Sequence, residues 1–382
     1  MQPTGTSAFL DEQGIAQHGA EVGLDAATIH ALGAFARHIA EEPLLQVVAT
    51  TAHHTVFSTA ADFAEAVQVA DMAFGAQAGM LHALFVLDGL RLIRERQQAR
   101  GIPPSMAMAV FERHGGGGLR DAAARGDVGL VGWTPGWLRT VTSGDMYRLG
   151  RLEFVATTLE YPQRVYRHAR TGTIIALAEA GEPFSDEGVL VGPHTWVSTL
   201  VETNDAIIGT PLSPHGIALR QVVRLRRDEW QLVLKPGDFI LDLHVPGDEP
   251  LTIAALRDAH VLAATFFDHY YADRPFVAYI CDSWLFSPLL EEMLGPNSNI
   301  VRWQYEGYLL PDDSEGEDLV ELAEAPRDTR LRRGLSARLA QGKLLYCGRY
   351  LFLRQDLDRF GSQPYREASA RAIARLTLPS SL

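Results

Sequence analysis

The chain has 382 residues, a length that favours two domains. It carries 34 Lys and Arg against 47 Asp and Glu, and the net charge of −13 argues against binding to nucleic acid or to an anionic membrane. Two cysteines, Cys281 and Cys347, are too few for a disulfide framework. The start of the chain lacks a signal-peptide pattern, and no apolar run reaches the roughly 18 residues that span a bilayer, so we expect a cytoplasmic protein.

Helical periodicity dominates the first 145 residues. Apolar side chains recur at a spacing of three to four over 26–40, over 59–73 and over 80–97, and each segment predicts a helix. Thr59 and Asp62 resemble a capping box that opens the second of these helices. We therefore predict a mainly helical N-terminal domain over residues 1–145.

From about Met146 the apolar residues alternate with a period of two, which is typical of strands. We expect helices after Thr252 and between Ser287 and Gly295, a solvated acidic loop over 311–324, and a solvated basic helix around Arg327–Arg338. Strands are predicted at 217–226, 239–245, 277–281, 300–310 and 343–354. This order predicts an α/β (α+β) domain with a mixed sheet over residues 146–382.

Common catalytic motifs are missing from the sequence. It contains no Walker A sequence, no Rossmann glycine fingerprint, no HExxH and no GxSxG. His53, His54 and His82 could be considered as metal ligands, but adjacent histidines on one element point in different directions, so we expect no metal. The glycine run in Arg113–Gly118 fits a phosphate-binding pattern, but it follows a predicted helix rather than a strand, and we interpret it as a turn.

Four segments carry a resemblance to one family. They read MYRLGRLEF from Met146, KPGDFILDLHVP from Lys235, CDSWLFSP from Cys281 and NSNIVRWQY from Asn297. In this order they resemble the two-domain GNAT-like N-acyltransferases, in which a mainly helical N-terminal domain precedes a GNAT-like C-terminal domain. The best understood members attach fatty acyl chains to the sugar amine of teicoplanin-type glycopeptide antibiotics.

The resemblance implies a place for acyl-CoA as co-substrate. In the GNAT fold it lies where two parallel strands separate, here 239–245 and 277–281. Its pantetheine arm would pair with the first strand and its pyrophosphate would sit at the start of the next helix. The binding residues implied are Leu243, His244, Val245, Leu251, Thr252, Ile253, Ala254 and Trp284. The sequence departs from the family at Gly247–Pro250, where two carboxylates replace the glycine-rich loop.

Direct acyl transfer to an amine needs a general base, a donor to the oxyanion and a proton for the leaving thiolate. His244 and His194 are the two candidate bases, and Ser283 is a candidate proton donor. Four aromatic residues in turn-rich sequence are candidates for binding a bulky acceptor: Trp133, Trp137, Tyr161 and Trp196.

We therefore expect an acyl-CoA-dependent N-acyltransferase that acts on an amino sugar, the glucosamine of a teicoplanin-like antibiotic. The alternatives are transfer to another small amine and a non-catalytic acyl-CoA-binding protein. Acyl length and oligomeric state are not defined by the sequence, and neither is whether the N-terminal half is a second, degenerate GNAT unit.

Overall fold

The structure, a computed structural model, describes residues 8–58, 63–111, 113, 116–129, 139–140, 143–247 and 249–379. The chain folds into two compact units, Met1–Arg148 and Leu149–Leu382, called here the N-terminal and the C-terminal unit. The fold class predicted from the sequence is confirmed, because helices make up most of the first unit and a mixed sheet lies in the second.

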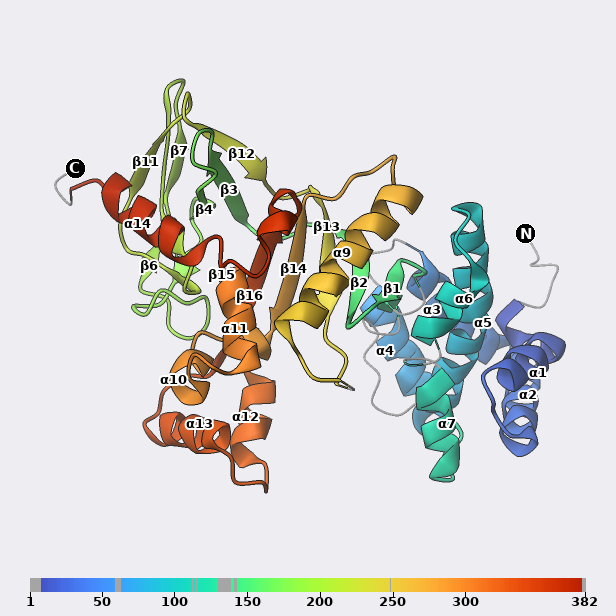
Figure 1. The fold of residues 1–382 in the computed structure, drawn as a ribbon. Coiled ribbons are helices and arrows are strands. Elements are labelled where there is room, and N and C mark those ends of the chain that lie inside the picture. Colours follow the sequence, from blue (N-terminus) through green and yellow to red (C-terminus); the bar gives the residue numbers. More distant parts are fainter. Residues whose placement is uncertain are drawn as a thin grey trace. The chain divides into compact units, whose positions relative to one another are not determined.

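The N-terminal unit consists of helices packed on a common apolar core (Figure 1). Asp11 and Asp25 cap the first two helices by accepting hydrogen bonds from Gly14 N and Thr28 N. The predicted helices are present, although the predicted cap at Thr59 and Asp62 lies outside the described residues. The helices are α1 (Glu12–Glu21), α2 (Ala26–Glu41), α3 (Pro43–Phe57), α4 (Phe63–Phe74), α5 (Ala78–Ala99), α6 (Pro104–Phe111) and α7 (Gly117–Ala124).

Helix α5 lies at the centre of this unit. All its residues from Leu81 to Leu90 are buried, although they include His82 and Asp88. The helical stretch Ala64–Ala99 is long and apolar enough to span a membrane by length and composition, and 44% of its most apolar window is buried within the protein. Core helices of globular proteins meet the same criterion, and the surrounding apolar contacts give α5 that role here.

A six-stranded sheet organises the C-terminal unit. Its order is β1-β2-β13-β14-β16-β15, with β13 and β14 parallel and β13–β2, β14–β16 and β16–β15 antiparallel. Helix α9 (Ile253–Tyr270) covers one face, where His260 packs against Tyr279 (Figure 1). The strands are β1 (Met146–Leu149), β2 (Leu152–Thr158), β13 (Phe239–His244), β14 (Ala278–Ser283), β15 (Tyr308–Glu315) and β16 (Tyr346–Leu353).

A five-stranded antiparallel sheet, β10-β9-β4-β3-β12, lies beside the edge strand β15 of the central sheet, where β9 and β10 contact that strand. Tyr308 joins the two sheets, since its hydroxyl donates to the Leu212 carbonyl and accepts from Ala176 N. Helix α14 (Arg366–Leu376) packs against β4, β9 and β11. The remaining strands are β3 (Gln163–His168), β4 (Ile174–Ala178), β5 (Pro183–Phe184), β6 (Trp196–Val197), β7 (Leu200–Glu202), β8 (Ala206–Gly209), β9 (Pro211–Ser213), β10 (Ile217–Ala218), β11 (Val223–Arg226) and β12 (Trp230–Leu234).

Four short helices form a satellite core beside the central sheet (Figure 1). They are α10 (Leu290–Leu294), α11 (Asn299–Glu306), α12 (Glu317–Glu324) and α13 (Arg330–Ala340). Leu290, Leu319 and Leu335 are fully buried in this cluster, and Trp284 and Ile300 pack against it. The predicted basic helix corresponds to α13.

Several predicted elements were wrong. Residues 300–306 belong to helix α11, which begins after the extended backbone of its N-cap Ser298 and ends at Gly307, before β15. The acidic segment 311–324 is not a solvated loop. Its Asp312 belongs to β15, is buried and is paired with Arg349 of β16, and its Leu319 is buried in α12.

Two further predictions fail on local turns. The alternation over 217–226 belongs to two strands in different sheets, β10 and β11, because a turn with a Gln221 N to Leu219 O hydrogen bond divides them. Ser287 does not cap a helix by its side chain; its carbonyl accepts from Leu290 N in a turn that precedes α10.

Candidate functional site

The parallel strands β13 and β14 separate towards their carboxyl ends. Their ladder pairs Leu241 with Tyr279 and Asp242 with Ile280. Beyond that point β13 stays paired with β2 as far as His244, and β14 stays paired with β16 as far as Ser283. The separation leaves a gap between two central strands at the edge where a loop leads into α9.

A cavity of about 620 Å³ opens at this gap. It takes its walls from the ends of both strands, from the β13–α9 connection and from the start of α11. The residues that line it are Arg151, Leu243, His244, Val245, Pro246, Gly247, Glu249, Pro250, Leu251, Cys281, Asp282, Ser283, Trp284, Leu285, Ser298, Asn299 and Ile300. Most of the predicted acyl-CoA-binding residues are thus brought together. Thr252, Ile253 and Ala254 lie outside the lining, and Thr252 caps α9 by accepting from Ala255 N.

Arg151 fixes the connection between β13 and α9. Its side chain is almost completely buried, and it donates from Nη2 to the Glu249 carbonyl at 2.5 Å and from Nε to the Pro250 carbonyl at 3.3 Å. These bonds are charge-assisted and hold the backbone at the cavity wall. Glu249 also lines the cavity, so an acidic residue lies at the wall where the family resemblance predicts the diphosphate of the donor. Asp248 lies outside the described residues.

A buried cluster of charged residues lies next to the cavity. Arg349 donates from Nε to Asp282 Oδ1 at 2.5 Å and from Nη2 to Asp312 Oδ2 at 2.8 Å. The Tyr161 ring covers the Arg349 guanidinium with 3.3 Å between the guanidinium carbon and the ring centroid. Burial raises the pKa of Asp282, an effect that Arg349 opposes, and burial together with Asp282 raises the pKa of Tyr161.

Asp242 and His244 project from β13 on the side of this cluster. His244 Nε2 lies 3.6 Å from Asp242 Oδ2. About a third of each side chain is accessible to solvent, and protein encloses the Asp242 carboxylate on its other sides. Burial and the neighbouring Asp282 carboxylate raise the pKa of Asp242 to about 8.

The wall opposite His244 is a short 3-10 turn, Trp284–Phe286. Ser283 Oγ accepts a hydrogen bond from Leu285 N at 3.2 Å, so the predicted proton donor also caps this turn. Beneath it, Gly348 of β16 has no room for a side chain, because a Cβ atom there would overlap the Phe286 carbonyl. The turn is therefore supported from below by backbone.

The other predicted residues lie elsewhere or outside the described chain. His194 lies on an exposed turn, where Nε2 donates to the Leu190 carbonyl at 2.7 Å, and it does not line the cavity with His244. Trp196 stacks on Phe184 with 5.0 Å between ring centroids. Trp133 and Trp137 lie outside the described residues, whereas Tyr161 lies in the charged cluster.

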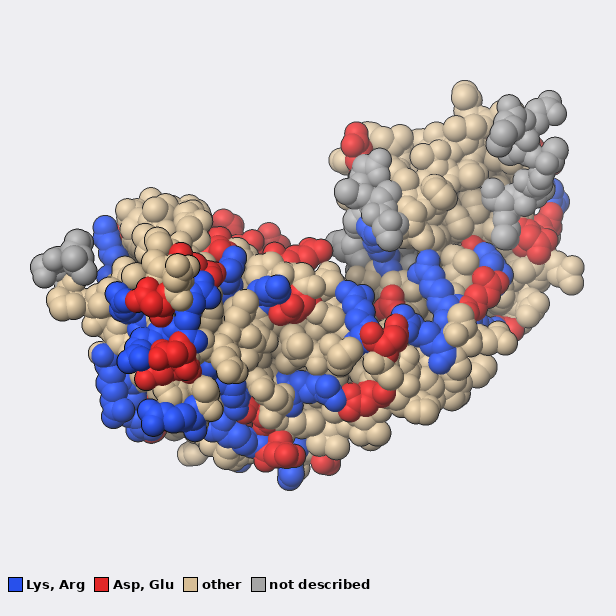
Figure 2. Space-filling view, turned by 90° about the horizontal axis from the view of Figure 1, so that it is seen from above, with Lys and Arg blue, Asp and Glu red and all other residues tan. Residues whose placement is uncertain are grey.

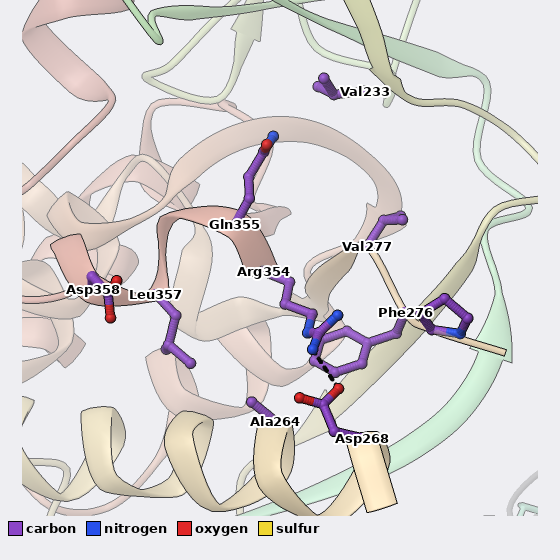
Figure 3. A pocket seen from close by; sticks show the side chains of 10 residues that line it. Val233, Ala264, Asp268, Phe276, Val277, Arg354, Gln355, Leu357 and Asp358 are labelled. Carbon is purple, nitrogen blue, oxygen red and sulfur yellow. Dashed lines mark hydrogen bonds and ion pairs between the residues drawn. The ribbon is translucent and has the colours of Figure 1, made fainter. Parts of the chain in front are cut away.

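A second cavity, of about 590 Å³, lies at the opposite end of β14 (Figure 3). Phe276 and Val277 precede the strand there, and an ion pair between Arg354 and Asp268 crosses the lining. Asp358 points from a different side of the same hollow. Its lining contains no histidine or cysteine.

The face drawn in Figure 2 carries charges of both signs. Basic and acidic side chains lie interspersed on it. The antiparallel strands β8 and β11 illustrate this pattern, with ion pairs between Arg224 and Asp205 and between Arg226 and Asp228. Such exposed pairs contribute little to stability.

Comparisons with known proteins agree with this architecture. The sequence matches the GNAT-like C-terminal domain family over residues 146–350, more than half of the chain. The chain belongs to this family. No curated protein matches the sequence significantly. The predicted family resemblance is confirmed.

Solved acyltransferase structures share the fold. One is an acyltransferase mutant in complex with octanoyl-CoA (18% identity, TM-score 0.54, 89% of this chain and 88% of that one covered). A second is an acyltransferase in complex with decanoyl-CoA (18%, TM-score 0.52, coverage 89% and 86%). A third is an acyltransferase in complex with CoA and 10C-teicoplanin (18%, TM-score 0.50, coverage 89% and 99%). These likenesses support the predicted acyltransferase fold across both units.

Sequence reasoning missed the charged cluster and Arg151. Asp242, Asp282 and Arg349 each interrupt an otherwise apolar strand, in FILDLH, AYICDS and YCGRYLFL. Charged residues in such strands are rarely buried without partners, so these interruptions were the available signal. Arg151 offered no such signal, because it lies in the tight turn between β1 and β2.

Proposed function

We propose that the protein is an acyl-CoA-dependent N-acyltransferase that transfers a medium or long fatty acyl chain to an amine. The observation that carries this proposal is the cavity at the separation of β13 and β14, with His244 and Ser283 on its two walls. A thioester lying between the strands would place its carbonyl within reach of both side chains. The octanoyl-CoA and decanoyl-CoA complexes of proteins with this fold support the same donor class.

In the proposed reaction the amine attacks the thioester carbonyl directly. The C–N bond forms, His244 accepts the proton of the attacking nitrogen, and the C–S bond then breaks. The thiolate of CoA takes up a proton from water, either directly or through Ser283, whose hydroxyl regains its proton from solvent. Backbone N–H groups near Val245 would stabilise the oxyanion, and no covalent acyl-enzyme is required.

The donor would be held mainly by its pantetheine arm and acyl chain. Leu243 and Val245 offer backbone groups at the end of β13, as an added strand would require. Glu249 disfavours the diphosphate, so apolar burial of the acyl chain would supply compensating affinity, at about 0.8 kcal/mol for each methylene. This predicts a preference for long over short acyl chains.

For the acceptor, we propose the amine of an amino sugar on a teicoplanin-like glycopeptide. The complex of a similarly folded acyltransferase with 10C-teicoplanin supports this choice. In this chain Tyr161 is the predicted acceptor-binding aromatic residue that lies beside the cavity residue Asp282. Another small amine remains the alternative acceptor.

The proposal is tested by thiol release from decanoyl-CoA, measured with and without a deacylated glycopeptide that bears free glucosamine. Acceptor-dependent release with a decanoyl mass gain supports both reaction and acceptor. Release that depends on a different amine keeps the reaction and replaces the acceptor. If decanoyl-CoA binds saturably but no amine tested leads to thiol release, the non-catalytic acyl-CoA-binding alternative is favoured.

Two variants separate the candidate bases. His244→Ala is expected to lower turnover by at least about 100-fold while donor binding persists, because general-base catalysis typically contributes 10²–10⁴-fold. His194→Ala is the matched control, since this histidine lies on an exposed turn away from the cavity. Loss of turnover in His194→Ala alone would transfer the role to that residue.

A further inference from the structure

Asp242 and His244 occupy alternate positions of β13, so both side chains point to the same face of the sheet. Their closest nitrogen–oxygen distance is 3.6 Å, within ion-pair range but longer than a hydrogen bond. His244 lines the donor cavity, whereas Asp242 is not part of its lining and lies two residues earlier on the strand. Asp242 is thus placed behind the candidate base.

The surroundings of Asp242 are short of positive charge. Asp282 faces it from β14, Arg349 from β16 and Tyr161 from the β2–β3 connection, while Glu153 of β2 lies opposite His244. Arg349 is already shared between Asp282 and Asp312. One guanidinium therefore serves two carboxylates. Among the residues that the structure describes, the basic group within ion-pair distance of Asp242 is the His244 imidazole.

We propose that Asp242 is a positioning residue that acts through His244: it orients the imidazole and offsets the positive charge that the imidazole acquires when it takes the proton of the attacking amine. The proposal rests on the function proposed above. Asp242 touches neither donor nor acceptor in this scheme.

The proton balance of the step is simple. An N–H bond of the acceptor breaks as the C–N bond forms, and the proton moves to the His244 ring. The resulting imidazolium is stabilised by an ionised Asp242 at ion-pair distance, and the proton later leaves to solvent or to the thiolate. Because Asp242 has a pKa of about 8, its ionised fraction, and with it the help it gives His244, increases between pH 7 and 9.

The test compares Asp242→Asn with wild type and with Asp358→Asn. Asparagine keeps the shape of the side chain but not the charge. Asp358 is a matched control because it is an exposed aspartate that lines only the second cavity (Figure 3). We expect Asp242→Asn to lower kcat for acyl transfer on the order of 10–100-fold, with KM for decanoyl-CoA changed less than about threefold, as is typical when a residue supporting a catalytic group is lost.

The dependence of kcat on pH is the readout that a merely structural role would not change. Wild type and Asp358→Asn should show a rate increase with an inflection near pH 8, and Asp242→Asn should lack it. An inflection that persists in Asp242→Asn would belong to the acceptor amine and would overturn the proposal. An unchanged kcat in Asp242→Asn would overturn it as well.

A second measurement does not depend on activity. The chemical shift of the His244 Cε1 proton is followed by NMR as a function of pH. In wild type the curve should show an inflection where Asp242 ionises, and Asp242→Asn should lack this inflection. If wild type shows the inflection but transfers no acyl group, the proposed function fails while the pairing stands. If the shift is identical in both proteins, the pairing itself is wrong.

Discussion

The Cys281 thiol donates a hydrogen bond to the Leu243 carbonyl, with 3.0 Å between sulfur and oxygen. This contact joins β14 to β13 one residue beyond the last paired residues of their ladder. It therefore lies at the apex of the gap and limits how far the two strands separate. Cys281 is buried, and burial raises the pKa of its thiol well above the ordinary value.

Cys281 is accordingly expected to be structural. Cys281→Ala should lower the free energy of unfolding by roughly 1–2 kcal/mol, because one buried hydrogen bond and a small volume are lost, while acyl transfer persists. In native protein at pH 8, iodoacetamide should label Cys281 far more slowly than in urea, as mass spectrometry can measure. Rapid labelling of the native protein with loss of activity would instead identify a reactive thiol.

Arg151 is expected to support donor binding. Arg151→Met removes the donors to the Glu249 and Pro250 carbonyls, and the freed loop should raise KM for decanoyl-CoA about tenfold with kcat changed little. Arg226→Met is the control, since Arg226 pairs with Asp228 on an exposed strand. A loss confined to kcat would show that Arg151 acts on the chemical step instead.

Glu249 should weaken donor binding through charge. Glu249→Gln is expected to lower the Kd of decanoyl-CoA two- to fivefold at low ionic strength, because about 1 kcal/mol of repulsion is removed from a solvated phosphate group. The gain should shrink in 0.5 M salt as charges are screened. Isothermal titration calorimetry measures both conditions, with exposed Glu367→Gln as the control. A gain that is independent of salt would contradict an electrostatic origin.

Asp242 also links stability to pH. Its folded-state pKa of about 8 lies above the ordinary 3.8, so the unfolded chain loses this proton first. The stability that Asp242 contributes is full below about pH 4 and is lost as pH rises through 8. Asp242→Asn should therefore have a higher Tm than wild type at pH 9, by a few degrees, since about 1 kcal/mol corresponds to 2–4 °C in a unit of this size. A difference in Tm that does not grow between pH 5 and 9 would contradict this.

Much of the fold follows from local sequence. Thr252 caps α9 as predicted, and the alternation in FILDLH places Leu241 and Leu243 on the face towards α9. The prediction of a strand around Ile300 was wrong because the segment is short and its apolar residues are closely spaced. The periodicity of its apolar residues does not distinguish a short helix from a strand. Only packing on the satellite core, through Ile300 and Trp284, decides that it is helical.

The site was predictable only in part. His244, Ser283 and Trp284 follow from the resemblance, because they lie within its matching segments. Asp312 was assigned to a solvated loop, since nothing in an acidic run distinguishes the one residue that meets Arg349 from its exposed neighbours. The contact between Asp312 and Arg349 depends on the pairing of β15 with β16, which are separated in sequence. The pattern of a single sequence does not reveal such a pairing.

Gly348 constrains how this cavity can vary. A side chain at this position would meet the Phe286 carbonyl, and the 3-10 turn that carries Ser283 and Trp284 would have to lift away from β16. In a saturation-mutagenesis library selected for acyl transfer, position 348 should therefore return glycine alone, whereas Trp284 should accept other large apolar residues. The absence of a side chain at Gly348 therefore determines the position of the turn Trp284–Phe286 at the cavity wall. Redesign for other acyl chains should vary this turn and leave β16 unchanged.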